Sequence, residues 1–424
     1  MIEGLKPYAA YSASGDRWLT KFPSTWERVR IKYLLQEIDR RTETGEEPLL
    51  SMRRDHGLVP LSQFSDKVAE PKALLAYKLV RPGELVVNRM QAGNGLVFVA
   101  RIPGLISPDY AIFRPVREVN LDYLEMLFRS YSMRAKFRSE STGLGTGTAG
   151  FLRLYGDSLG AIEIGLPSAD EQSQIVRFIN HADLQIRRYI RGKKKLIALL
   201  NEQKQTVIDR AVTRGLEPIV SLKPSGVAWL GDVPQHWEVW QVGHFGRVGN
   251  GSTPSRGQPA YWSGGSYPWL NSSSVNRSPI SGSGQFVTDL ALRECHLPRV
   301  PPSSVLVAIT GQGKTRGTAA VLATEATINQ HIAYITPRPD IVSAEYLQLL
   351  LVGAYRELRS ISDDSGSTKG ALTCADVAHF KVALPALEEQ ERIIGAVRLA
   401  TQRLEAALVR SQREIELLIE YRVA

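Results

Sequence analysis

The chain has 424 residues, a net charge of +9 and a pI near 9.4. Hydrophobic residues make up 43% and charged residues 22%, which excludes a disordered chain and indicates a globular protein of two or more domains. Two cysteines, Cys295 and Cys374, exclude a disulfide framework and a cysteine-rich zinc site, and they favour a reducing compartment. Apolar runs are too short for a membrane span, and the first residues lack the core of a signal peptide. We therefore expect a cytoplasmic protein without a membrane partner, and its charge favours a polyanion.

The first elements along the chain belong to an internal repeat. Residues 14–27 and 225–238 match without a gap at seven of fourteen positions, and both end in Pro-x-x-Trp-Glu. The tryptophans repeat as pairs, which favours core packing over base stacking. They are Trp18 and Trp26 in the first copy, and Trp229 and Trp237 in the second.

Strand and turn patterns repeat after these openings. Residues 85–89 predict a strand that enters the Gly-rich turn 92–95, and a second strand follows near 96–100. The corresponding pattern later in the chain comprises 305–309, the turn 311–313 and the strand 319–323. Short amphipathic helices are predicted to begin near Asp122 and Glu345.

A long helix is predicted from Leu166 to Gly215. It opens with Leu-Pro-Ser-Ala-Asp-Glu-Gln, where proline precedes the helix and Ser168 or Asp170 can cap it. Gly215 is a plausible C-cap. The apolar stripe that we expect to face a partner helix comprises Ile175, Ile179, Ala182, Ile186, Tyr189, Leu196, Leu200 and Val207.

The partner helix is predicted at residues 384–424. It opens with Leu-Pro-Ala-Leu-Glu-Glu-Gln, which repeats the first start signal. Its predicted stripe comprises Ile393, Val397, Ala400, Leu404, Leu408, Ile415 and Leu418. Neither stripe can be buried by one helix alone, so we expect the two helices to pack as an antiparallel coiled coil.

These elements predict an α+β fold with a pseudo-two-fold internal repeat. We expect globular domains at residues 1–165 and 216–383, and long helices at 166–215 and 384–424. A basic protein with two similar domains held at a fixed distance by helices would suit a bipartite nucleic-acid site. A duplicated scaffold that binds only proteins remains an alternative.

The Pro-x-x-Trp-Glu openings of both halves and the Leu-Pro-x-x-x-Glu-Gln openings of both helices resemble one family across essentially the whole chain. It is the specificity subunit of type I restriction-modification systems. The resemblance implies two target recognition domains, each reading half of a split double-stranded DNA site. It also implies that the helices set the spacing and dock two methyltransferase subunits, which bind S-adenosylmethionine and methylate adenine N6. A motor-nuclease subunit would complete the complex.

Motifs for chemistry within the chain itself are weak. Residues 308–315, Ala-Ile-Thr-Gly-Gln-Gly-Lys-Thr, fit a relaxed P-loop, but a strand rather than the required helix is predicted next. Residues 107–110, Ser-Pro-Asp-Tyr, lack the second proline of the adenine-binding motif of N6-methyltransferases. The histidines show no metal-ligand spacing. We therefore expect no catalytic residue, no metal site and no directly bound cofactor. An NTP-binding enzyme centred on Lys314 and a coiled-coil protein scaffold are the alternatives.

Loop residues with hydrogen-bonding or cationic side chains are the candidates for DNA contact, since such side chains read base edges and bind phosphates. In the first half they are Arg89, Gln91, Asn94, Thr146 and Thr148, and Arg53 and Arg54 could add phosphate contacts. In the second half they are Asn271, Ser273, Asn276, Arg277, Lys314, Arg316, His331 and Lys369. The basic run 187–195 of the first long helix could face an acidic partner or the DNA spacer.

Overall fold

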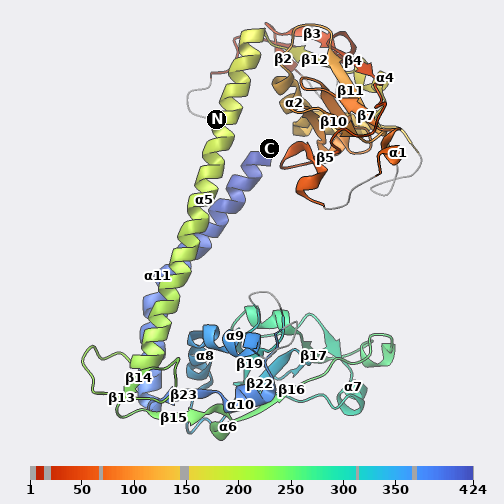
Figure 1. Ribbon diagram of the computed structural model, residues 1–424. Coiled ribbons are helices and arrows are strands. Elements are labelled where there is room, and N and C mark those ends of the chain that lie inside the picture. Colours follow the sequence, from red (N-terminus) through yellow and green to blue (C-terminus); the bar gives the residue numbers. More distant parts are fainter. Residues whose placement is uncertain are drawn as a thin grey trace. The chain divides into compact units, whose positions relative to one another are not determined.

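The structure is a computed structural model that describes residues 6–13, 21–65, 70–143, 152–311, 315–364 and 370–423. The chain divides into two compact units (Figure 1). The first unit comprises residues 1–191 and 415–424, and the second comprises residues 192–414. Both long helices cross the boundary between the units.

The first unit contains short strands and short helices. Its strands are β1 (Tyr11–Ala13), β2 (Lys21–Pro23), β3 (Glu27–Arg30), β4 (Leu35–Ile38), β5 (Leu50–Arg53), β6 (Gly57–Pro60), β7 (Lys78–Val80), β8 (Leu85–Asn88), β9 (Val97–Val99), β10 (Gly104–Ile106), β11 (Tyr110–Pro115) and β12 (Glu163–Leu166). Its helices before the long one are η1 (Ile31–Tyr33), η2 (Leu61–Gln63), α1 (Pro71–Leu74), η3 (Ala92–Asn94), α2 (Leu121–Arg129), α3 (Tyr131–Glu140) and α4 (Gly156–Ala161).

The first unit is built around a four-stranded antiparallel sheet in the order β4-β11-β8-β9. Successive side chains of a strand point to opposite faces, and both faces of β8 are buried. Leu85 and Val87 pack with α2 and α3 in one core, while Val86 packs with β5, β6 and β10 in another. This two-sided burial explains why β8 reads as a continuous apolar run.

The second unit repeats this inventory with different loop lengths. Its strands are β13 (Leu222–Pro224), β14 (Asp232–Pro234), β15 (Glu238–Gln241), β16 (Gly246–Asn250), β17 (Tyr267–Leu270), β18 (Phe286–Val287), β19 (Val305–Ala308), β20 (Ala319–Val321), β21 (Thr327–Ile328), β22 (Ile332–Pro337) and β23 (Lys381–Leu384). Its shorter helices are α6 (Val242–Phe245), η5 (Pro259–Tyr261), η6 (Ser272–Asn276), α7 (Asp289–Glu294), α8 (Ala344–Gly353), α9 (Tyr355–Asp364) and α10 (Cys374–His379).

The central sheet of the second unit has the order β16-β22-β19-β20, which matches the first sheet strand for strand. Val305 and Val307 of β19 pack with α8, while Leu306 and Ala308 face the core that contains η6 and β21. The pairing of β17 with β21 is parallel, and the other strand pairs described are antiparallel. The described residues thus have the mixed helix and strand content expected of an α+β fold.

The two long helices are α5 (Ala169–Arg214) and α11 (Leu387–Val423). Each begins three residues after the predicted start, because residues 163–166 and 381–384 form strands β12 and β23 first. Within the second unit they run antiparallel. Lys193 pairs with Glu414 at 2.5 Å, and Lys204 pairs with Glu405 at 2.6 Å. The helix α5 ends at Gly215, whose φ of +70° is the left-handed conformation typical of a C-cap glycine.

The predicted apolar stripes are only partly correct. Three predicted members of the α5 stripe are exposed, at 41% for Ile179, 62% for Tyr189 and 40% for Leu196, so they do not lie on the buried face. On α11, Ala400 is exposed and the neighbouring Thr401 is buried instead. The error has a physical cause. Burial depends on which face of a helix meets its neighbours, so the small polar Thr401 is buried because it lies on that face, whereas Ala400 does not.

The entry and exit strands of each unit pair with each other. Strand β3 pairs with β12, and β15 pairs with β23, so each long helix leaves beside the strand that follows a Pro-x-x-Trp opening. The two sequence signatures meet at this seam. The Trp26 indole N–H donates to Glu171 at 3.2 Å, and the Trp237 indole N–H donates to Glu389 at 3.2 Å.

The glutamine that follows each of these glutamates is buried and satisfies backbone groups. Gln172 donates to the Pro167 carbonyl at 2.8 Å and accepts from the Asn120 N–H at 2.9 Å. Gln390 makes the corresponding contacts with Pro385 and Ser343, at 3.0 and 3.1 Å. Since buried backbone groups require partners, these contacts explain why glutamine recurs at this position of both helix openings.

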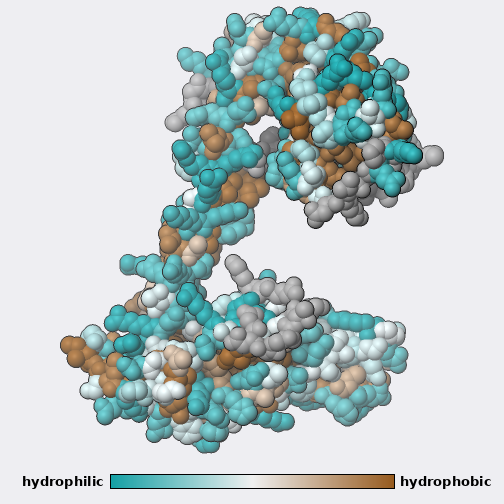
Figure 2. Space-filling model, viewed as in Figure 1, coloured by the Kyte–Doolittle hydropathy of each residue, from teal (hydrophilic) through white to brown (hydrophobic). Residues whose placement is uncertain are grey.

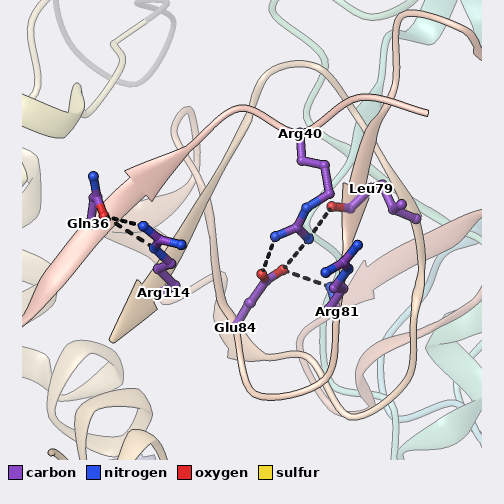
Figure 3. A network of polar contacts seen from close by, with 6 residues as sticks. All are labelled: Gln36, Arg40, Leu79, Arg81, Glu84 and Arg114. Atoms are coloured by element: carbon purple, nitrogen blue, oxygen red, sulfur yellow. Dashed lines mark hydrogen bonds and ion pairs between the residues drawn. The ribbon is translucent and has the colours of Figure 1, made fainter. Parts of the chain in front are cut away.

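An ion pair fixes the turn that leads into β8 (Figure 3). Arg40 binds Glu84 at 2.8 Å and the Leu79 carbonyl at 3.3 Å, while Glu84 also accepts the Arg81 backbone N–H at 2.7 Å. Nearby, Arg114 of β11 donates to Gln36 of β4 at 2.8 Å, across the same sheet. These contacts hold one end of β8, and the opposite end leads into the candidate site.

Candidate nucleic-acid interface

The turn between β8 and β9, residues 89–96, is called the first-unit tip. The Gln91 N–H donates to Asn88 and the Asn94 N–H donates to Gln91, which winds the turn into η3. Gly95 closes it with a φ of +80°, where a side chain would be strained. The side chains of Gln91 and Asn94 are both exposed. The tip therefore presents two amide groups, a side-chain type that can read adenine edges.

Arg89 lies at the same tip but is held internally. Its guanidinium forms an ion pair with Glu37 of β4, and its carbonyl accepts the Leu154 N–H at 2.9 Å. Its Nε is buried and has no hydrogen-bond partner among the described residues. Arg89 thus anchors the base of the tip, and its predicted DNA contact stays a prediction.

Four arginines that converge on the first-unit tip form what we call the first-unit arginine cluster: Arg54, Arg129, Arg134 and Arg138. Arg134 and Arg138 of α3 both donate to the Gly93 carbonyl, from Arg134 at 3.5 Å. Arg129 donates to the Arg54 carbonyl at 3.2 Å and stacks on the Phe98 ring at 4.5 Å. Burial, followed by the nearby charges of Arg138, Arg54 and Arg129, lowers the pKa of Arg134.

Sequence reasoning found Arg54 but missed the three arginines from α2 and α3. A signal was present, because residues 126–139 contain Arg129, Arg134, Lys136 and Arg138 and no acidic residue. Arg134 and Arg138 are four positions apart and so share a helix face. Nothing local indicated that this face meets the hairpin, which only the packing of α3 against η3 shows.

The corresponding turn of the second unit, residues 309–318, is called the second-unit tip. Gly317 has a φ of +84° at the position that corresponds to Gly95. Arg316 is only 3% exposed and donates to the Gly370 carbonyl at 2.7 Å, so it holds this loop rather than presenting a cation to solvent. His331 bonds through one ring nitrogen to Thr310 at 2.8 Å and through the other to Gln330 at 3.2 Å.

The polar run after β17 lies against the second-unit tip. Asn271 caps η6 by accepting from the Ser273 N–H and hydroxyl, at 3.0 and 2.6 Å. Asn276 is exposed and accepts from the Thr315 hydroxyl at 3.5 Å, and the next side chain, Arg277, is exposed. Asn276 and Arg277 are therefore available for contact, whereas Asn271 and Ser273 stabilise the local turn.

Four predicted contacts, Thr146, Thr148, Lys314 and Lys369, lie outside the described residues. The strand β20 follows Lys314 after a short turn, where a P-loop would require a helix. An NTP-binding site centred on Lys314 therefore has no support.

The Ser-Pro-Asp-Tyr motif at residues 107–110 takes part in a structural ion pair. Asp109 of the Ser-Pro-Asp-Tyr turn pairs with Arg153 at 3.1 Å. Among the described residues, no group of three or more His, Cys, Asp or Glu side chains is placed to hold a metal ion. No helix in the described part of the chain is long and apolar enough to cross a membrane.

Comparisons with known proteins agree with this architecture. Residues 234–401 match the family model described as Type I restriction modification DNA specificity domain. The specificity subunit of the type I restriction enzyme MjaIX from Methanocaldococcus jannaschii is 31% identical over 39% of this chain and 38% of its own length. The EcoR124I/EcoR124II specificity subunit from Escherichia coli is 21% identical over 42% of each chain. The chain thus aligns with less than half the length of these relatives.

Solved structures share the fold over almost the full length. A chain from a study of complex assembly and conformational transition of the type I R-M system matches with a TM-score of 0.70 at 18% identity, covering 96% of this chain and 97% of that one. The HsdS subunit from Thermoanaerobacter tengcongensis matches with a TM-score of 0.52 at 17% identity, covering 95% and 97%. These structures show the shared fold. The family model and the two curated relatives confirm the resemblance of this chain to the specificity subunits of type I restriction-modification systems.

Proposed function

We propose that this chain is the non-catalytic DNA-specificity subunit of a type I restriction-modification complex. Each globular half reads one half of a bipartite double-stranded DNA site. The observation that carries the proposal is the match of residues 234–401 to a DNA specificity domain, which spans most of the second unit.

The first unit is included because it repeats the second in strand order and in specific contacts. Both units hold a Trp–Glu hydrogen bond of 3.2 Å at the seam and a buried glutamine at the helix opening. Both also close the central hairpin with a left-handed glycine, Gly95 or Gly317. Two units of the same design support two readers, and the different residues at their tips support two different half-sites.

The long helices have the properties of a spacer that also docks partners. Each carries apolar side chains away from the other helix: Leu184, Tyr189 and Leu199 on α5, and Leu399 and Val409 on α11, are all more than half exposed. Apolar surface is visible along the helices in Figure 2. Burying these side chains against another protein would be favourable, because it removes apolar surface from water. We assign this surface to two methyltransferase subunits.

Chemistry then belongs to the partners. The methyltransferase subunits would bind S-adenosylmethionine and methylate adenine N6, and motor-nuclease subunits would complete the restriction complex. In this scheme the chain itself binds no cofactor. Its role is to determine which adenines the methyltransferase subunits meet.

A domain exchange tests the proposal. The chain is expressed with its methyltransferase subunit in a host without such systems, and N6-methyladenine is mapped genome-wide. Residues 27–166, from β3 to β12, are then replaced by the corresponding residues of a relative, so that the seam pairing remains within one parent. We expect one half of the methylated motif to change and the other half to persist. A motif that stays the same, or changes in both halves, would contradict the assignment of one reader to each unit.

A further inference from the structure

The first-unit arginine cluster brings positive charge from separate elements to one point. Arg134 and Arg138 lie one turn apart on α3, and both side chains reach the carbonyl of Gly93. Arg134 also lies beside Gly95, since a Cβ there would lie 3.2 Å from the Arg134 Cδ. Arg54 comes from the turn between β5 and β6, and its carbonyl is held by Arg129. The cluster therefore surrounds the base of the tip that presents Gln91 and Asn94.

Most of this charge has no neutralising partner. Arg129 pairs with Glu125 at 3.1 Å. Within the described part of the chain, no carboxylate forms a salt bridge with Arg54, Arg134 or Arg138. Like charges held close together repel, and the lowered pKa of Arg134, caused by burial and then by the other arginines, agrees with this repulsion. A bound anion would relieve it, and guanidinium groups bind phosphate in a two-pronged geometry.

The second unit differs at the same place. Its tip lies against Tyr355 and Arg359 of α9, at 3.4 and 3.5 Å from a Cβ built on Gly317. The helix α9 carries two basic and three acidic residues, whereas α3 carries three basic residues and one acidic residue. Arg359 of α9 thus lies beside Gly317 much as Arg134 lies beside Gly95, although α9 is less basic than α3.

We propose that Arg54, Arg134 and Arg138 bind a backbone phosphate of DNA beside the bases that the first-unit tip reads. The inference rests on the proposed function. The contact is electrostatic and independent of the base sequence. Its chemistry is that of a single phosphate diester rather than of a base edge.

The test measures DNA affinity against salt for the full chain with its methyltransferase subunits. The probe is a fluorescent duplex that carries the motif found by methylation mapping, between 50 and 200 mM NaCl. For Arg134→Gln/Arg138→Gln we expect about tenfold weaker binding and a slope of log K against log salt that is smaller by about 0.9, the value for one lost phosphate contact. The matched control is Arg81→Gln, an exposed arginine at the opposite end of β8, which should change neither quantity. A double variant with the slope of the control would overturn the inference.

A second measurement locates the contact and does not depend on the stability of a variant. Each phosphate flanking the half-site of the first unit is replaced in turn by a neutral methylphosphonate. The DNA affinity of the wild-type complex should fall about tenfold when one particular phosphate is neutralised. The affinity of Arg134→Gln/Arg138→Gln should not fall further at that position. The site would be refuted if no neutralised phosphate weakened binding by wild type. It would also be refuted if every neutralised phosphate weakened the double variant as much as wild type. Failure of wild type to prefer the motif over random duplex would instead refute the proposed function.

Discussion

A matched insertion in both long helices tests whether they set the spacing between half-sites. Four residues, Ala-Glu-Ala-Lys, are inserted after Leu199 of α5 and after Val409 of α11. Both side chains are exposed, at 53% and 72%. The two insertions lie between the same interhelical ion pairs, Lys193–Glu414 and Lys204–Glu405. The pairing on either side is therefore preserved.

The expected change follows from helix geometry. Four residues add about 6 Å and rotate the helix about 40° beyond a full turn. One base pair of duplex adds about 3.4 Å and about 34° of twist. Length alone favours an increase of about two base pairs, whereas rotation alone favours about one. The spacer of the methylated motif should therefore grow by one or two base pairs, with both half-site sequences unchanged.

Genome-wide mapping of N6-methyladenine reads the result directly. The first control replaces residues around Leu199 and Val409 without changing length, and it should leave the motif unchanged. The second control inserts four residues into α5 alone, so that only one of the two ion pairs can keep its register. It should methylate less efficiently than the matched variant. An unchanged spacer in the matched variant, or an altered half-site, would refute the reasoning.

Three further predictions concern the second unit. Glu389→Ala removes the acceptor of the buried Trp237 N–H and should lower the free energy of unfolding by about 2 kcal/mol in urea titrations, against less than about 0.5 kcal/mol for the exposed control Glu391→Ala. Gln390→Leu leaves three backbone groups without their partner and should cost about 3 kcal/mol in the same assay; a loss below about 1 kcal/mol would show that they find other partners. Burial raises the pKa of Asp209, so the folded state favours the protonated carboxyl. The resulting stabilisation of the fold is present at low pH and is lost as pH rises through the raised pKa. Asp209→Asn should therefore raise the melting temperature at neutral pH, with a gain that disappears below about pH 4, and a pH-independent difference would argue against this cause.

Local patterns predicted the elements whose signals lie within a few residues. The strands near 85–89 and 305–309, the hairpins that follow them and both long helices appear where glycine turns and apolar periodicity indicated. The match of tryptophans and of Leu-Pro-x-x-x-Glu-Gln openings also pointed to the family that the chain resembles in the comparisons. These patterns can be recognised in the sequence because each one depends on residues within a short stretch of chain.

Contacts between distant segments could not be read in the same way. The exposure of Tyr189 and Leu196 depends on which face of α5 meets α11, and four-residue spacing alone permits neighbouring faces. The burial of Arg316 depends on Gly370, which lies on a loop 54 residues away. The arginine cluster depends on the docking of α3 against the first-unit tip. Each is a product of tertiary packing rather than of local propensity.

The seam strands also constrain the order in which the chain folds. Glu163 of β12 meets Arg30 of β3 across 133 residues, so this pairing closes one of the longest loops in the first unit. Distant pairings form slowly, because the loop entropy is lost before the contact is gained. On the ribosome the first unit can close only once β12 has emerged, and α5 begins three residues later. A ribosomal pause near residue 200 would therefore give the first unit time to close before its counterpart strands from the second unit are made and compete for the same edges.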